Sequence, residues 1–453
     1  MITIKNIAKY SIRTWAIALF VSQSAIAGIP VVQWVQSSGA RIFLVESPAI
    51  AMVDVKLDFD AGARRDPAGK VGLASVTAAT ASQGISARGN EPALDENALG
   101  EAWADLGASF GAGASSDRMS FSLRSLTYPD LLPKAVALAA RQLGEPSFPQ
   151  NVWQRDRQRM IASIKESNTR PATVAGRAFA ANVYSGHPYG NEVTEASLAN
   201  ISTADMQALY ARAIRPCRAV VTIVGAVTRA QADALVSQML SRLPAASNVD
   251  CAALPAVAEV PPLAQPKDER LPFESAQAHV LIGQPGFKRD DPDFFALTVG
   301  NYVLGGGGFV SRLTAEVREK RGLSYSVYSY FNPALHAGAF TIGLQTRPDQ
   351  ANQAVQVSRD VLAKFVAEGP TEGELKAAKD NLIGGFALRI DTNAKLLDNV
   401  ATVAWNNLSL DYLDTWTQQV DKITLADIKA AFGRKLQPQR MVTVVVGGVE
   451  AGK

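Results

Sequence analysis

Short segments with alternating apolar and polar residues recur along the chain, and longer segments with helical spacing separate them. Between residues 53 and 59 every second residue is apolar and the intervening residues are charged, which predicts a strand with one buried face. Strands are also expected at 31–36, 41–46, 119–123 and 219–224. Helices are expected at 72–83, 96–106, 133–143, 151–166 and 229–243. Together these elements predict an α+β fold.

The second half of the chain repeats the first. Residues 201–227 and 423–449 align without a gap at an offset of 222, and 11 of the 27 aligned positions are identical. Each copy contains a hydroxyl residue suited to cap a helix, Ser202 or Thr424, and an aspartate follows at the third helical position. The repeat predicts two copies of one mixed strand–helix domain, each of about 200 residues.

A proline-rich segment separates the two copies. Residues 244–267 contain five prolines among alanines and serines, a composition that is typical of an extended, semi-rigid linker. We therefore expect an N-terminal domain at 28–243, a linker at 244–267 and a C-terminal domain at 268–453.

The first 27 residues have the pattern of a secretory signal peptide. Three basic residues precede a short apolar run at 15–21, and Ala25-Ile26-Ala27 offers a cleavage site after Ala27. No later apolar run approaches the length of about 18 residues that a transmembrane helix needs, so we expect no membrane span. In a bacterium the mature chain would then be periplasmic.

Charge and cysteine content give further information on the kind of partner and on the cellular compartment. Without the leader, 42 Lys and Arg are balanced by 42 Asp and Glu, and no basic stripe indicates binding to nucleic acid. The two cysteines, Cys217 and Cys251, would be exported to an oxidising compartment. That compartment favours one disulfide between them, with two free thiols as the alternative.

The chain lacks the spacing of a metal-binding motif. Its three histidines, His187, His279 and His336, are 92 and 57 residues apart, and neither cysteine is close to them in the sequence. A zinc site usually takes three or four ligands, often in closely spaced pairs. We therefore expect no catalytic zinc in this chain, and a structural role for His187 in a turn.

A run of four glycines opens the segment with the most distinctive chemistry. Gly305, Gly306, Gly307 and Gly308 leave the backbone without Cβ constraints, so that it can lie close against another chain. The run lacks the Gly-Lys-Ser/Thr ending of a phosphate-binding loop. It is interpreted either as a flexible turn or as a loop that contacts substrate.

A helix and a strand are expected after the glycines. The spacing of Leu313 and Val317 predicts an amphipathic helix at 311–320 that ends near Gly322, and aromatic and β-branched residues predict a strand at 323–330. Arg318 would lie in the last helical turn and Tyr325 at the start of the strand. A guanidinium and a phenol held close together suit a carbonyl, a carboxylate or the oxyanion of a tetrahedral intermediate. On spacing alone, the alternative is a surface arginine and a half-buried strand tyrosine without a shared role.

The run from Ser311-Arg-Leu to Val317-Arg-Glu-Lys-Arg-Gly-Leu-Ser-Tyr325 resembles the C-terminal half of pitrilysin-type peptidases, the family of insulin-degrading enzyme and mitochondrial processing peptidase. The resemblance implies two homologous mixed α/β sandwich domains. It also implies that Arg318 and Tyr325 contact substrate near the scissile bond. The glycine run is similar to the substrate-contacting loop of the noncatalytic subunit of the mitochondrial enzyme.

The resemblance fails at the metal site. Members of this family carry an inverted zinc motif, His-x-x-Glu-His, after a Gly-Leu-Ala that aligns with residues 72–74. The ligand and base positions then fall on Ser75, Ala78 and Ala79, and the third ligand falls near Ser163. None of these residues can replace the histidines or glutamates of the motif.

These observations lead to one functional hypothesis and two alternatives. In two-chain members of the family, one subunit carries the zinc motif and the other carries the Arg/Tyr pair and the glycine-rich loop. The chain is therefore interpreted as the second kind of subunit in a periplasmic heterodimer, with zinc held by a homologous partner and peptides as substrates. It could instead be a catalytically inactive peptide-binding or scaffold protein, or a zinc-independent hydrolase that is active alone.

Overall fold

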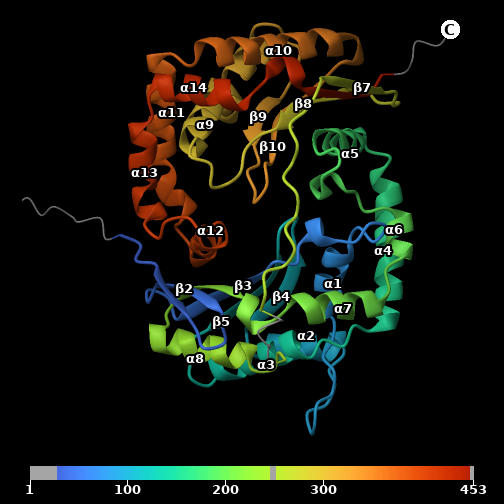
Figure 1. The fold of residues 1–453 in the computed structure, drawn as a ribbon, viewed down its shortest axis with the longest axis vertical. Coiled ribbons are helices and arrows are strands. Elements are labelled where there is room, and N and C mark those ends of the chain that lie inside the picture. Colours follow the sequence, from blue (N-terminus) through green and yellow to red (C-terminus); the bar gives the residue numbers. More distant parts are fainter. Residues whose placement is uncertain (1–27, 245–250, 449–453) are drawn as a thin grey trace, which may run out of the picture.

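The structure is a computed structural model that describes residues 28–244 and 251–448. The predicted signal peptide at 1–27 lies outside the described residues. Within them, the strands form two sheets, one in each half of the chain, and the two halves face each other (Figure 1).

The sheet of the N-terminal half has six strands in the order β1-β2-β6-β3-β5-β4. Strands β2 and β6 are parallel, and the other neighbours are antiparallel. The strands are β1 (Val32–Val35), β2 (Arg41–Glu46), β3 (Met52–Phe59), β4 (Ser109–Ala114), β5 (Met119–Leu126) and β6 (Val220–Gly225). The helices of this half are α1 (Leu73–Ala81), α2 (Glu96–Asp105), α3 (Leu132–Gly144), α4 (Gln150–Ser167), α5 (Pro171–Val183), α6 (Glu195–Ala199), α7 (Thr203–Ala213) and α8 (Arg229–Leu240).

The sheet of the C-terminal half has five strands in the order β7-β11-β8-β10-β9. Strands β7 and β11 are parallel, and the other neighbours are antiparallel. The strands are β7 (Lys267–Leu271), β8 (Ala278–Pro285), β9 (Val327–Phe331), β10 (Ala339–Thr346) and β11 (Val442–Val446). The helices of this half are α9 (Phe294–Asn301), α10 (Ala351–Glu368), α11 (Glu372–Gly384), α12 (Asn393–Trp405), α13 (Tyr412–Lys422) and α14 (Leu425–Lys435).

The two sheets share one topology once β1 is left out. The order β2-β6-β3-β5-β4 corresponds strand by strand to β7-β11-β8-β10-β9, with the parallel pair at the same position. The repeated caps are also equivalent, because Ser202 Oγ and Thr424 Oγ1 each accept a hydrogen bond of 3.2 Å from the backbone N–H three residues on. The predicted α+β fold of two homologous domains is confirmed.

Each half contributes one helix that packs on the sheet of the other half. Helix α5 packs on β8 and β11, and helix α12 packs on β3 and β6 (Figure 1). The two helices are themselves equivalent in the repeat, because residues 171–183 and 393–405 differ by the same offset of 222. Phe179 packs in an apolar cluster with strand β11, and Val400 packs in another with Val224. Burial of these apolar faces couples the two halves.

This exchange corrects the prediction for residues 53–59. Strand β3 was expected to bury only its apolar face, but its charged face is also covered, by α12. Asp58 is fully buried and accepts a hydrogen bond of 2.9 Å from Arg118. Lys56 forms an ion pair of 2.9 Å with Asp398 on α12. A buried charge is tolerated when it is paired in this way.

The described part of the linker, residues 251–266, runs between the halves without helix or strand (Figure 1). A disulfide joins Cys217 to Cys251 at its start. Farther along, Glu259 forms an ion pair of 2.8 Å with Lys288. Strand β7 begins at Lys267, the last residue of the predicted linker. The linker is therefore fixed to both halves.

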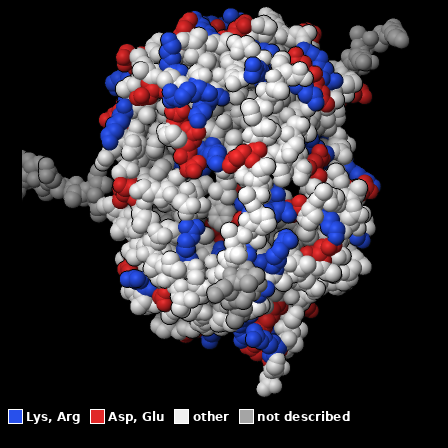
Figure 2. All heavy atoms as spheres, viewed as in Figure 1, with Lys and Arg blue, Asp and Glu red and all other residues white. Residues whose placement is uncertain are grey.

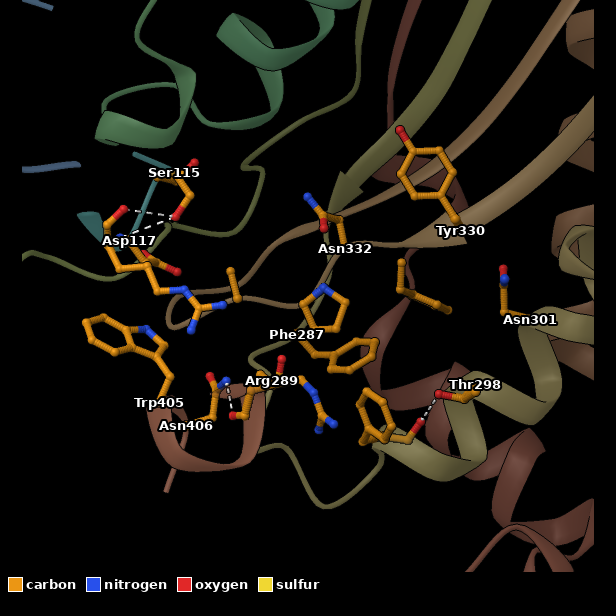
Figure 3. Close-up of a pocket in the computed structure, with 17 residues that line it drawn as sticks. Ser115, Asp117, Phe287, Arg289, Thr298, Asn301, Tyr330, Asn332, Trp405 and Asn406 are labelled. Carbon is orange, nitrogen blue, oxygen red and sulfur yellow. Dashed lines mark hydrogen bonds between the residues drawn. The ribbon is translucent and has the colours of Figure 1, made fainter. Parts of the chain in front are cut away.

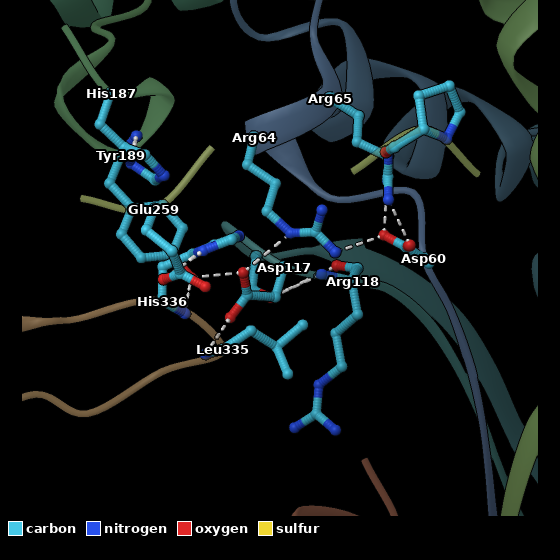
Figure 4. A network of polar contacts seen from close by, with 12 residues as sticks. Asp60, Arg64, Arg65, Asp117, Arg118, His187, Tyr189, Glu259, Leu335 and His336 are labelled. Atoms are coloured by element: carbon cyan, nitrogen blue, oxygen red, sulfur yellow. Dashed lines mark hydrogen bonds and ion pairs between the residues drawn. The ribbon is translucent and has the colours of Figure 1, made fainter. Parts of the chain in front are cut away.

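Asp117 lies at the centre of a polar network between the halves (Figure 4). Its carboxylate accepts hydrogen bonds from the side chains of Arg64 at 3.1 Å and Tyr189 at 2.5 Å in the N-terminal half. It also accepts one of 3.2 Å from the backbone N–H of Leu335 in the C-terminal half. The network fixes the spacing of the halves at this point.

Two surface properties complete the description of the fold. On the face shown in Figure 2, basic and acidic side chains are interspersed. Among the described residues, no helix has both the length and the apolar character needed to span a bilayer.

Candidate functional site

Arg318 lies in a short π-helical segment, Thr314–Glu319, and Gly322, the residue predicted to end the helix, follows three residues after it. Gly322 has φ +62°, a conformation that favours glycine. Its N–H donates to the carbonyl of Arg318 at 2.8 Å, and the N–H of Leu323 donates to that of Val317 at 2.9 Å. These bonds turn the chain back toward the helix end, which brings the next residues alongside Arg318.

Tyr325 precedes strand β9, so the prediction of a strand from residue 323 is wrong in its start. Ser324 explains the difference. Its Oγ donates to the carbonyls of Ser326 at 2.6 Å and Gln345 at 2.7 Å. These side-chain bonds take carbonyls that a strand ladder would otherwise use. The chain enters the regular strand only at Val327.

Arg318 stacks between two aromatic rings. Its guanidinium carbon lies 4.8 Å from the ring centroid of Tyr325 and 4.8 Å from that of Phe309. Tyr325 is 81% exposed and Phe309 69% exposed. We call these three residues the Arg318 cluster. Within the described part of the chain, neither the Arg318 guanidinium nor the Tyr325 hydroxyl has a hydrogen-bond partner, so both can donate to a ligand.

Phe309 was missed by the sequence analysis. It directly follows the glycine run. Its position after four glycines was the available signal.

The glycine run is helical for part of its length, which argues against one of its two interpretations, a flexible turn. A second π-helical segment, Tyr302–Gly306, extends α9 and includes Gly305 and Gly306. A Cβ added to Gly305 would lie 2.4 Å from Ser329 Oγ, and one added to Gly307 would lie 2.7 Å from the carbonyl oxygen of Tyr302. Close packing therefore requires these glycines.

Gly308 differs from the other three glycines. It has φ +61° and no neighbour within 4 Å of an added Cβ. It turns the chain outward, so that Phe309 projects beside Arg318. Contact with substrate at the glycine run remains a prediction.

Helix α1 carries Ser75, Ala78 and Ala79, the residues expected at the positions of the family's zinc motif. Ser75 and Ala79 are exposed and lie one helical turn apart, whereas Ala78 is buried. Asp66 caps the helix, because its carboxylate accepts from the N–H groups of Gly72 at 2.8 Å and Ala74 at 2.9 Å. Burial raises the pKa of Asp66 to about 6. A helix is therefore present at the expected place, with Ser75 and Ala79 on its exposed face.

The side chains on that face do not fit zinc. A hydroxyl and two methyl groups replace two imidazoles and a carboxylate, and Ser163 on α4 also lacks a metal-binding group. Across residues 28–244 and 251–448, no group of three or more His, Cys, Asp or Glu side chains could hold a metal ion.

The structure brings two of the three histidines together. The rings of His187 and His336 lie 5.0 Å apart between centroids. His187 is buried, and its Nδ1 accepts a hydrogen bond of 3.1 Å from the backbone N–H of Tyr189. It thus caps a turn, the structural role expected of it. His279 lies apart from this pair, on β8.

Comparison with known proteins finds family matches in both halves of the chain. Residues 41–197 match the family model described as insulinase (peptidase family M16), and residues 200–382 match the model described as peptidase M16 inactive domain. The crystal structure of a peptidase M16 inactive domain from Pseudomonas fluorescens superposes with a TM-score of 0.86 at 33% identity, covering 93% of this chain and 99% of that one.

Two relatives carry names that differ in the activity they state. A Streptomyces coelicolor protein named as an uncharacterized zinc protease is 33% identical over 176 residues, which are 38% of each chain. A Helicobacter pylori protein named non-peptidase homolog YmxG is 26% identical over 412 residues, 87% of this chain and 89% of that protein. The resemblance inferred from the sequence is confirmed: the chain belongs to the insulinase family of peptidases, family M16.

Proposed function

We propose that this chain is the non-metal-binding subunit of a heterodimeric, periplasmic zinc peptidase. The observation that carries the proposal is the contrast between two sites. The Arg318 cluster presents unpaired donors to solvent, whereas helix α1 keeps its exposed face without any metal ligand. Such a chain can contribute to peptide hydrolysis only beside a homologous subunit that carries His-x-x-Glu-His and its zinc.

In this proposal the chain binds and orients the peptide. Strand β9 lies at the edge of its sheet, so a peptide can pair with it as an added strand. Arg318 donates to the substrate carbonyl and orients it. Tyr325 donates through its hydroxyl to the oxyanion that forms when the carbonyl is attacked. Neither residue needs to change its protonation state.

The second candidate is a peptide-binding or scaffold protein without catalytic activity of its own. The name of the Helicobacter pylori relative, non-peptidase homolog, favours it. If this candidate is correct, no complex of the chain with a partner subunit gains peptidase activity from the chain.

One experiment separates the two candidates. The purified chain is mixed with a homologous subunit that carries His-x-x-Glu-His, and cleavage of a peptide library is measured with and without a chelator. Chelator-sensitive cleavage that requires both chains is expected. Complex formation without cleavage would favour the scaffold, and cleavage by the lone chain would favour the zinc-independent hydrolase.

A further inference from the structure

A cavity of about 590 Å³ lies between the two halves and does not include the Arg318 cluster or helix α1 (Figure 3). The turn between β4 and β5 contributes Arg118, and the connection before α9 contributes Arg289. Strand β9 contributes Tyr330, and the end of α12 contributes Trp405. Segments that are distant in the sequence thus form one cavity that is large enough to hold a ligand.

The ionisable residues on its wall leave an excess of positive charge. Asp117 is already neutralised by its contact with Arg64. Arg118 is paired with Asp58 and stacks over Trp405 at 5.6 Å. Arg289 has no carboxylate partner within the described residues. The cavity therefore holds one guanidinium without a counter-ion.

Arg289 is held rigidly. Its guanidinium carbon lies 3.9 Å from the ring centroid of Phe294 and 5.0 Å from that of Tyr412. Its Nη2 donates to the hydroxyl of Tyr412 at 2.6 Å. Burial raises the pKa of Tyr412, so this partner is a neutral phenol and leaves the positive charge uncompensated. The remaining donors of the guanidinium keep the fork geometry that matches a carboxylate.

The single unpaired positive charge and the side chains that line the cavity favour one class of anion over others. One unpaired arginine balances one negative charge, whereas a phosphate monoester carries nearly two at neutral pH. The aromatic rings of Phe287, Phe331 and Trp405 also line the cavity and suit an apolar side chain next to the anion. A carboxylate attached to an apolar residue fits both features.

Strand β9 connects the cavity with the Arg318 cluster. Tyr330 lines the cavity and stacks on Tyr328, with ring centroids 6.0 Å apart. Both tyrosines are on the exposed face of this edge strand, which begins two residues after Tyr325. The five residue steps from Tyr325 to Tyr330 span at most about 17 Å. An extended peptide along β9 can therefore reach both sites.

We propose that this cavity binds a carboxylate of an extended peptide, with Arg289 as the residue that recognises it. The identification of the ligand as a peptide rests on the proposed function. The carboxylate is either the C-terminus of the peptide or an acidic side chain near its end, and both sources have the same chemistry.

Binding of fluorescent octapeptides to the full chain tests the proposal by anisotropy. Three peptides share one sequence with an apolar last residue: one has a free C-terminus, one a C-terminal amide, and one an amide with glutamate at the penultimate position. The amide without glutamate is expected to bind at least tenfold more weakly than a carboxylate-bearing peptide. A response to the free C-terminus alone, or to glutamate alone, identifies the source of the carboxylate.

Variants locate the site. Arg289→Gln is expected to remove the advantage of the carboxylate, and Arg289→Lys to retain only part of it. The matched control is Arg347→Gln, because Arg347 is exposed and pairs with Asp349 outside the cavity. Equal binding of all three peptides, or an Arg289→Gln protein that folds and keeps the preference, overturns the proposal.

The result of this binding test can be distinguished from the result of the cleavage test of the proposed function. Carboxylate-dependent binding by the lone chain supports the cavity even when no partner produces cleavage. Conversely, cleavage by a two-chain complex that is indifferent to amidation and to Arg289→Gln leaves the proposed function in place and overturns the cavity assignment.

Discussion

Phe179 on α5 lies directly against Gly283 on β8, in the other half of the chain. A Cβ added to Gly283 would come within 2.7 Å of Phe179 Cζ. The contact is possible only because Gly283 lacks a side chain, and it places a helix of the N-terminal half on the sheet of the C-terminal half. Neither half can bury its sheet fully without the other.

Removing this ring should destabilise the whole chain. Phe179 is buried, so Phe179→Ala is expected to lower the free energy of unfolding by about 3 kcal/mol. Urea unfolding followed by tryptophan fluorescence measures the change. Tyr128→Ala is the control, because Tyr128 is 50% exposed and should cost less than 0.5 kcal/mol. A loss below about 1 kcal/mol for Phe179→Ala would show that the exchanged helix contributes little.

The disulfide should stabilise the chain by holding the start of the linker. Cys217 and Cys251 are 34 residues apart, and closing a loop of that length is worth about 3–4 kcal/mol in the chain-entropy estimate. The double variant Cys217→Ser, Cys251→Ser is expected to melt at a lower temperature than the oxidised protein. Reductant should lower the melting temperature of the wild-type protein to that of the variant. Equal melting temperatures without reductant would argue against a stabilising bridge.

Stability in acid should depend on Glu374. Arg312 donates two hydrogen bonds of 2.7 Å to its carboxylate, and this contact lowers the pKa of Glu374 from 4.5 to about 2. A pKa lowered by folding stabilises the protein above pH 4.5, and that contribution is lost as the pH falls toward 2.

Glu374→Gln should therefore lower the free energy of unfolding by about 1 kcal/mol at pH 7, and the difference from the wild type should shrink below pH 4.5. Denaturation curves between pH 7 and pH 3 measure this. Lys376→Gln serves as the control, since that side chain is 77% exposed. A difference that stays constant with pH contradicts the assignment.

A second pH dependence should arise at the contact between the halves. Burial, with a smaller contribution from nearby His336, lowers the pKa of His187. Folding therefore favours the neutral imidazole, so its contribution is present above pH 6.5 and is lost as the pH falls further. The charged groups that face it are Asp117 and Glu259.

The variant His187→Asn keeps an acceptor for the N–H of Tyr189 but cannot titrate. Its stability is expected to change less than that of the wild type between pH 7.5 and pH 5.5. Unfolding curves at the two pH values measure the slope. Identical slopes would mean that His187 is protonated equally easily in the folded and unfolded chain.

The sequence alone was sufficient to predict the duplication and several helix ends. The repeated Ser202 and Thr424 cap their helices, and Gly322 makes the turn that follows the segment carrying Arg318. Strand β4 was not predicted, because Ser109–Ala114 is made mostly of glycine and alanine and lacks β-branched residues. The cap signals act within a few residues, and the duplication is visible as a repeat at an offset of 222, so both can be recognised in a single sequence.

The features that depend on distant contacts could not be predicted. No spacing in the sequence indicates that Gly305 packs against Ser329, or that α5 leaves its own half. The stacking of Phe309 on Arg318 depends on the outward turn at Gly308. The cavity around Arg289 likewise combines segments from both halves.

The rate of peptide cleavage by the two-chain complex tests the central claim most directly. Tyr325→Phe removes one donor to the oxyanion and is expected to lower kcat by about 10²–10³-fold, or about 2.7–4 kcal/mol. Arg318→Ala should also lower kcat/KM, and Tyr128→Phe, far from both sites in the sequence and exposed, should leave it unchanged. Cleavage at the wild-type rate by the Tyr325→Phe complex would contradict the division of one active site between two subunits.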